Sequence, residues 1–126
     1  MRKIYISGGI TGVEDYKERF AAEEKVLEVK GYEVVNPVKV GEKLIEVFEG
    51  EKNVPYCLFM RADLKALLEC THIYMLDNWY KSKGAIIEYI VAKVCGLKVV
   101  HQGVRHIDFL PWSKVVILLS EVTKNG

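Results

Sequence analysis

Residues 72–96, HIYMLDNWYKSKGAIIEYIVAKVCG, predict a buried strand, a polar loop and then a helix that begins near Gly84. The helical part is apolar on nearly every side, and Glu88 is the exception. The positions one helical turn away from it include Gly84, Ala85 and Ala92, so a single carboxylate interrupts a stripe of small side chains. Small side chains beside a carboxylate leave room for a ligand.

Strand and helix patterns alternate along the rest of the chain. We expect strands at residues 2–7, 32–35, 72–76 and 97–101, helices at 14–30, 55–70 and 84–95, a short helix at 43–49 within the poorly determined segment 38–53, and a final helix or strand at 111–123, with helix favoured. This alternation predicts an α/β fold with a parallel sheet and helices on both faces. The expected architecture is a Rossmann-like or flavodoxin-like three-layer sandwich with a four- to five-stranded, mainly parallel sheet.

Length and charge limit the possible functions. The chain has 126 residues, half of them hydrophobic, which is enough for one domain, residues 1–126, with a real core. With 18 basic and 17 acidic residues the net charge is +1, so no overall field favours a nucleic acid polymer or a membrane surface. The longest apolar run, residues 85–94, is broken by Glu88 and Lys93 and is too short to span a bilayer. We therefore expect a soluble protein in which any phosphate is bound by a local site.

The cysteines and histidines show no disulfide or metal pattern. Cys57, Cys70 and Cys95 are odd in number and far apart, with no CxxC pair, and no signal peptide is evident. They are typical of reduced core cysteines in a cytoplasmic protein. The three histidines have no ligand spacing, so we expect neither a metal nor another cofactor.

In a parallel sheet of this kind a ligand binds outside the carboxyl ends of the strands. The loop at residues 8–12 belongs to that edge, but its glycines form neither a dinucleotide fingerprint nor a P-loop, so a tight turn and a ligand-binding loop are both open. The loop before Gly84 belongs there too. Lys81, Ser82, Lys83 and Gly84 together predict an anion site at a helix N-terminus, the alternative being that Ser82 only caps the helix and the lysines are solvated.

Two carboxylates are candidates for chemistry. Complete burial of Glu88 would raise its pKa by up to ~3–5 pH units, and proteins usually keep such a group for chemistry or for a specific hydrogen bond. A salt bridge to a lysine is the alternative, although neither Lys83 nor Lys93 has the three- or four-residue spacing. Asp63 is expected beside the buried stripe of its helix, unless Arg61 or Lys65 holds it at the surface.

Four segments together resemble a known family. They are KIYISGGITG at residues 3–12, RADL at 61–64, LLEC at 67–70 and SKGAIIEY at 82–89. They look like the motifs of the nucleoside 2-deoxyribosyltransferase superfamily, including a small branch in bacteria and phages and the 2′-deoxynucleoside 5′-monophosphate N-hydrolases. The resemblance spans roughly residues 3 to 101 and is more specific for the superfamily than for one activity within it.

The resemblance implies roles for individual residues. Glu88 matches the nucleophile that forms a covalent glycosyl-enzyme, Asp63 matches the acid that contacts the sugar or assists the leaving base, and Tyr5 matches a tyrosine near the nucleophile. Cleavage of an N-glycosidic bond through an oxocarbenium-like state is chemistry that two carboxylates support. Hydrolysis or transfer to a second base would follow.

Further residues are implied in binding. Gly8, Gly9, Ile10 and Gly12 correspond to the first ligand-binding loop, and Ser82 matches a hydroxyl that binds the 5′-phosphate, with Lys81, Lys83 and Gly84 beside it. Trp79 is a candidate for stacking on a base, with packing of the loop as the commoner use. Thr11 departs from the basic residue of the hydrolase branch.

The implied protein is a cytoplasmic homo-oligomer that binds a nucleotide or nucleoside. The serine and lysines before Gly84 favour a nucleotide. A nucleotide-binding module on the same fold without turnover is the alternative, because fold alone does not establish catalysis.

Overall fold

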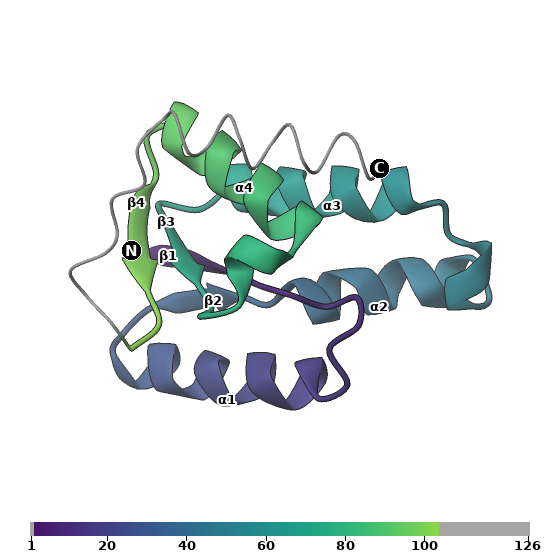
Figure 1. Cartoon of the computed structure of the whole chain (residues 1–126), viewed down its shortest axis with the longest axis horizontal. Helices are drawn as coiled ribbons and strands as arrows, with labels where there is room; N and C mark the ends of the chain where they lie inside the picture. The colour runs from purple at the N-terminus through teal and green to yellow at the C-terminus, as the bar shows by residue number, and fades with distance from the viewer. Residues whose placement is uncertain (1, 104–126) are drawn as a thin grey trace.

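The computed structural model describes residues 2–103, and its centre is a parallel sheet (Figure 1). The strands are β1 (Lys3–Ser7), β2 (Glu33–Val35), β3 (His72–Met75) and β4 (Lys98–His101), in the spatial order β2-β1-β3-β4. Every neighbouring pair is parallel. The predicted α/β fold with a parallel sheet is confirmed, with four strands in the described part of the chain.

Helices cover both faces of this sheet. The described residues form four α-helices, α1 (Tyr16–Val29), α2 (Pro37–Val47), α3 (Tyr56–Leu68) and α4 (Lys83–Val94), and two short 3-10 helices, η1 (Glu51–Asn53) and η2 (Trp79–Lys81). In Figure 1, α1 lies below the sheet and α3 and α4 lie above it. This is the predicted three-layer sandwich.

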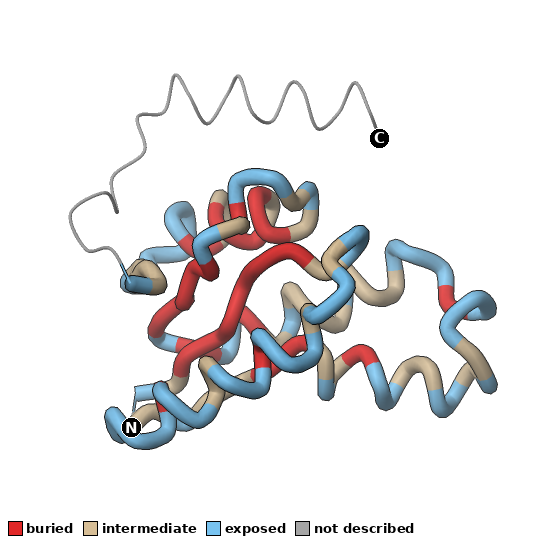
Figure 2. The backbone as a smooth tube through the Cα atoms, turned by 60° about the horizontal axis from the view of Figure 1, so that its bottom comes forward, coloured by how far each residue is buried: buried red, intermediate tan, exposed pale blue. Residues whose placement is uncertain are grey.

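The two sides of β1 and β3 supply two separate cores. Tyr5, Ile73 and Met75 pack under α3 and α4, whereas alternate residues such as Ile6 and Tyr74 pack toward α1. The alternation follows from the two-residue period of a strand. Both strands are buried on both faces, and Figure 2 shows the buried backbone concentrated there. Strands enclosed on both faces are typical of parallel sheets.

Helix α2 corrects the prediction for residues 38–53. A short helix at residues 43–49 was expected, but the helix begins at Pro37 and ends at Val47. The Asn36 side chain caps it by accepting a hydrogen bond of 3.0 Å from the Val38 amide, and proline suits the first turn of a helix. Asn36 and Pro37 therefore end a strand and begin a helix at once.

Other expectations hold or fail locally. Gly31 and Gly96 follow α1 and α4 with positive φ angles, a conformation that glycine commonly supplies at the end of a helix. The prediction of three core cysteines is wrong for two of them, because Cys70 is buried while Cys57 and Cys95 are exposed. Residues 111–123 lie outside the described part of the chain. Within residues 2–103, every helix is too short or too polar to cross a membrane.

The sheet order also locates a switch point. From β1 the chain adds β2 on one side and then returns to add β3 on the other side. In open α/β sheets the crevice at the carboxyl ends of two such strands is the usual place for a ligand. The loops that follow β1 and β3 border this crevice.

Candidate active site

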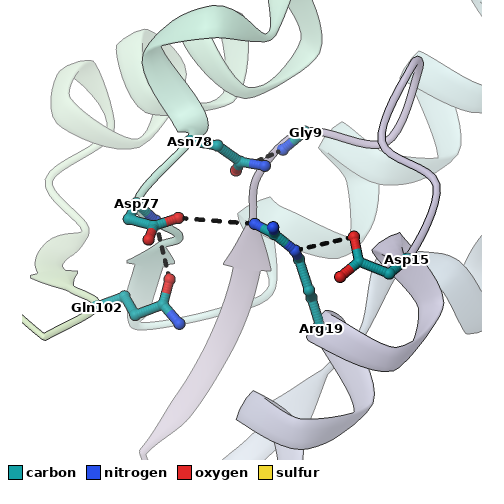
Figure 3. Close-up of polar contacts among 6 residues, drawn as sticks. All are labelled: Gly9, Asp15, Arg19, Asp77, Asn78 and Gln102. Carbon is teal, nitrogen blue, oxygen red and sulfur yellow. Dashed lines mark hydrogen bonds and ion pairs between the residues drawn. The ribbon is translucent and has the colours of Figure 1, made fainter.

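Polar contacts join the loops at the switch point (Figure 3). The Gly9 amide, after β1, donates a hydrogen bond of 3.1 Å to the Asn78 side-chain oxygen, after β3. Arg19 of α1 lies between Asp15, at 3.1 Å, and Asp77, at 4.0 Å. These contacts tie the loops at the carboxyl ends of β1 and β3 to one another and to α1.

The glycines of the first loop have packing roles. A Cβ atom on Gly8 would lie 2.6 Å from the Leu76 side chain, so only glycine fits there. The Gly9 amide is engaged with Asn78, and Ile10 packs against the core toward α1. Gly12 has a φ of 79° with open space around it. Ligand contacts by these residues stay a prediction.

Glu88 is enclosed and bound by two hydroxyl groups. Glu88 is only 5% exposed to solvent. The Tyr5 hydroxyl donates a hydrogen bond of 2.6 Å to Oε2, and the Ser7 hydroxyl donates one of 2.6 Å to Oε1. Tyr5 and Ser7 are both fully buried and lie two residues apart on β1, so they reach the same face. The buried carboxylate is thus held by two hydroxyl groups from one strand.

Burial and hydrogen bonding act in opposite directions on this carboxyl group. Burial raises the pKa of Glu88 to about 7, and the hydrogen bonds from Ser7 and Tyr5 oppose that rise by favouring the anion. The pKa of the Tyr5 hydroxyl is raised well above its ordinary value, by burial first and then by the charge of Glu88. Tyr5 therefore remains a hydrogen-bond donor at neutral pH.

Asp63 faces the same region from α3. It belongs to a helical stripe with Tyr56, Met60 and Leu67, and Leu67 is fully buried. Burial raises the pKa of Asp63 to about 8, and the charge of Glu88 adds to the rise. In the described part of the chain neither Arg61 nor another cation forms an ion pair with it. The inward-facing position is the one that the sequence predicted.

The first turns of α3 and α4 meet in front of the two carboxyl groups. A Cβ atom on Gly84 would lie 3.5 Å from the Met60 methyl carbon and 3.6 Å from the Tyr56 hydroxyl oxygen. Burial, followed by the charges of Glu88 and Asp63, raises the pKa of Tyr56. Tyr56 is nevertheless 61% exposed, which places it between the carboxyl groups and solvent.

The remaining predicted binding residues surround the start of α4. Ser82 caps the helix by accepting a hydrogen bond of 3.2 Å from the Ala85 amide, and Lys81 and Lys83 are exposed. Trp79 is only 9% exposed and stacks on Tyr89 at 4.7 Å between ring centroids. Its described contacts are those of a packing residue, the alternative use that the sequence left open.

A surface hollow of about 550 Å³ lies elsewhere. Arg2, Thr71, His72, Leu97 and Lys98 are among its lining residues. These residues surround the amino ends of β3 and β4, at the opposite edge of the sheet from the carboxyl groups. Because neither Glu88 nor Asp63 lines it, the hollow is not the candidate active site.

Sequence reasoning missed Ser7 and Tyr56. Ser7 shares a strand face with Tyr5, so the two-residue period was the signal that could have identified it. Tyr56 lies seven residues before Asp63, two helical turns along the same stripe. In both cases the pattern was present, but the partner element that completes the contact was not visible in the sequence.

Comparisons with known proteins agree with this architecture. A solved structure of the 2-deoxyribosyltransferase from the psychrotolerant bacterium Bacillus psychrosaccharolyticus is similar, with a TM-score of 0.61, 20% sequence identity, and coverage of 90% of this chain and 89% of that chain. The match shows a shared fold and confirms the predicted structural resemblance. No curated protein sequence matches significantly. Residues 2–101 match the model of the family described as "Domain of unknown function (DUF4406)", and the chain belongs to that family.

Proposed function

We propose that this protein cleaves the N-glycosidic bond of a deoxynucleoside or its 5′-monophosphate through a covalent glycosyl-Glu88 intermediate. One observation carries the proposal: a buried glutamate accepts two short hydroxyl hydrogen bonds, and its charge acts on a second, partly buried carboxyl group, Asp63. The shared fold with a 2-deoxyribosyltransferase, a protein described as a biocatalyst for nucleoside synthesis, supports the choice of substrate class.

The two carboxyl groups have different roles in the proposed reaction. The Glu88 carboxylate attacks the anomeric carbon, forming a C–O bond as the bond from that carbon to the base nitrogen breaks. Asp63, whose pKa is raised to about 8, holds the proton at neutral pH and transfers it to the departing base. The developing positive charge on the sugar is stabilised by the nearby Glu88 anion.

The second step returns the enzyme to its starting state. Asp63, now a carboxylate, takes a proton from a water molecule that attacks the anomeric carbon and releases Glu88. The products are the free base and 2-deoxyribose or its 5-phosphate. A second base in place of water gives a new nucleoside, and the same residues then perform transfer. Tyr5 and Ser7 remain donors to Glu88 throughout.

Substrate binding is proposed at the adjoining loops. The loop at residues 8–12 borders the sugar, and Ser82 with Lys81, Lys83 and Gly84 binds the 5′-phosphate. The first amides of a helix point out of its N-terminus and favour an anion, which supports this placement at α4. Assembly as a homo-oligomer in the cytoplasm stays a prediction of the resemblance.

The deciding experiment is a base-release assay on purified protein. Deoxynucleosides and their 5′-monophosphates are incubated with and without a second free base, and release or exchange is followed by chromatography. Base release that is lost in Glu88→Gln and kept in Glu23→Gln supports the proposal, and exchange only on addition of a base identifies a transferase. Tight nucleotide binding by an inactive wild type would establish the binding module instead.

A further inference from the structure

Glu88 and Asp63 differ in the hydrogen-bond donors that their carboxyl groups receive. Glu88 has one hydroxyl donor on each carboxylate oxygen, from Tyr5 and Ser7 at 2.6 Å. Among the described residues, no hydrogen-bond donor is seen for the Asp63 carboxyl group. One buried carboxyl is therefore fitted with fixed donors, and its neighbour is not.

The donors are held rigidly. Tyr5 and Ser7 belong to β1, which pairs with β3 across both residues and with β2 across Tyr5. Both side chains are completely buried, so neither hydroxyl competes with bulk water for its acceptor. Hydrogen bonds to an ionised acceptor are shorter and stronger than those to a neutral one. Two fixed donors therefore favour a negative charge on Glu88.

The other groups around Glu88 do not replace these donors. From α3, Asp63 and Tyr56 face it, the first a carboxyl and the second a largely exposed phenol. From β3 the residues on this face are the apolar Ile73 and Met75. The ionisable groups of the remaining neighbours lie farther out: Lys81 of η2 and Lys83 of α4 are exposed, Lys98 of β4 is at the opposite edge, and His101 of β4 lies against Trp79.

We propose that Ser7 is a positioning residue that assigns the proton shared by the two carboxyl groups to Asp63 and keeps Glu88 as the anion. Two carboxyl groups whose charges interact do not both ionise readily, and the charge of Glu88 acts on Asp63, so the pair tends to retain one proton near neutral pH. The carboxyl that receives the hydroxyl hydrogen bonds loses its proton first. The catalytic consequence, a charged nucleophile beside a protonated acid, rests on the proposed function.

Removal of the Ser7 hydroxyl should reverse this preference. In Ser7→Ala, Oε1 of Glu88 becomes a buried acceptor without its donor, and protonation of Glu88 is the least costly response. The negative charge then moves to Asp63. The proton stays in the pair but occupies the wrong carboxyl group, so nucleophile and acid are both lost without any change of net charge.

The test is an NMR titration of carboxyl carbons in protein labelled with ¹³C at the side-chain carboxyls of Asp and Glu. Signals are assigned with Glu88→Gln and Asp63→Asn. In the wild type, Glu88 should titrate below Asp63. In Ser7→Ala, the pKa of Glu88 should rise by about one pH unit or more, a tenfold change in its proton-dissociation constant, while that of Asp63 falls.

Two further variants control the titration. Ser7→Cys nearly keeps the volume and offers a weaker donor, so a smaller rise at Glu88 is expected and the test remains available if Ser7→Ala fails to fold. Tyr74→Phe removes another hydroxyl–carboxylate bond of 2.6 Å, to Glu23, and should leave the Glu88 titration unchanged.

Each outcome decides the inference. An unchanged Glu88 titration in Ser7→Ala and Ser7→Cys, or an Asp63 that ionises first in the wild type, overturns it. Because the titration needs no substrate, it distinguishes this failure from failure of the proposed function, which the base-release assay reports. If base release is observed, Ser7→Ala should also move the acidic limb of the pH–rate profile to higher pH.

Discussion

Two tyrosine–carboxylate hydrogen bonds of the same length, 2.6 Å, lie on opposite faces of the sheet. Tyr5 of β1 donates to Glu88 of α4, and Tyr74 of β3 donates to Glu23 of α1. Glu23 is half-buried, whereas Glu88 is enclosed. The first pair has a second hydroxyl and a second carboxyl group beside it.

The difference shows what turns a common contact into a candidate for catalysis. A single phenol on a half-buried glutamate satisfies a polar group where a helix packs on a sheet. Enclosure makes the charge of Glu88 expensive, yet hydroxyls from the strand favour that charge, and the charge in turn raises the pKa of Asp63. Such opposing effects are characteristic of sites where protonation is put to use.

The largest contrast in base-release activity is expected between the variants Glu88→Gln and Glu23→Gln. Glu88→Gln keeps the shape but removes the nucleophile, and base release should fall by ~10⁴-fold or more. Glu23→Gln makes the same chemical change on the other face and should leave kcat within about twofold of the wild type. Steady-state chromatographic assays measure both, and equal losses would contradict the assignment of Glu88.

The next effect concerns the proton on Asp63. Activity requires ionised Glu88, whose pKa is about 7, and protonated Asp63, whose pKa is about 8. The rate should therefore rise as pH increases through about 7 and fall as pH increases through about 8, giving a narrow optimum. Asp63→Asn should lower kcat by ~10²-fold or more and remove the alkaline limb.

A substrate that needs no acid sharpens this test. A deoxynucleoside whose base departs as a stable anion should lose much less activity in Asp63→Asn than one whose base must be protonated. Equal losses on both substrates would mean that Asp63 contacts the sugar without donating a proton.

Most of the fold was predictable because its signals are local. The alternation of apolar strands with helical stripes, and glycines such as Gly31 and Gly96 after helices, follow from periodicity and backbone conformation. Helix α2 was misjudged because Asn36 and Pro37 are signals both for the end of a strand and for the start of a helix. The choice between them depends on the packing of α2 against α3, which no local pattern contains.

The site was predictable only in part. Glu88 was conspicuous because a carboxylate among small apolar residues contradicts a purely structural helix. Ser7 was not, because a serine that ends a strand is ordinary until the sheet brings it under α4. Burial of Trp79 depended on its stacking with Tyr89, a contact between η2 and α4. Partners from distant elements decide the function of such residues.

Stability should reveal the same carboxyl pair without any substrate. The pKa of Asp63 rises from 3.8 to about 8 on folding, so between these pH values the folded protein retains a proton that the unfolded chain has released. The contribution of Asp63 to the free energy of unfolding therefore becomes less favourable as pH rises through this window. It is most unfavourable above about pH 8. Asp63→Asn should stabilise the protein by at least ~1 kcal/mol at pH 9, with little change at pH 4.

Thermal unfolding at the two pH values measures this difference. Asp77→Asn is the matched control, since the side chain of Asp77 is 72% exposed and water solvates its charge. If Asp63→Asn stabilises the protein equally at pH 4 and pH 9, loss of the carboxylate charge is not the cause of the stabilisation.

The smallest expected effect is at Tyr56. Its hydroxyl lies near Gly84, at the mouth of the carboxyl site, and we expect it to donate a hydrogen bond to the bound substrate. Tyr56→Phe should therefore raise KM by ~3–10-fold, the usual worth of one such bond, with kcat nearly unchanged. Tyr80→Phe is the control, because Tyr80 is 51% exposed and contacts Lys81. A fall in kcat at constant KM would instead place the Tyr56 hydroxyl at the reacting atoms, and equal values for both variants would remove Tyr56 from the site.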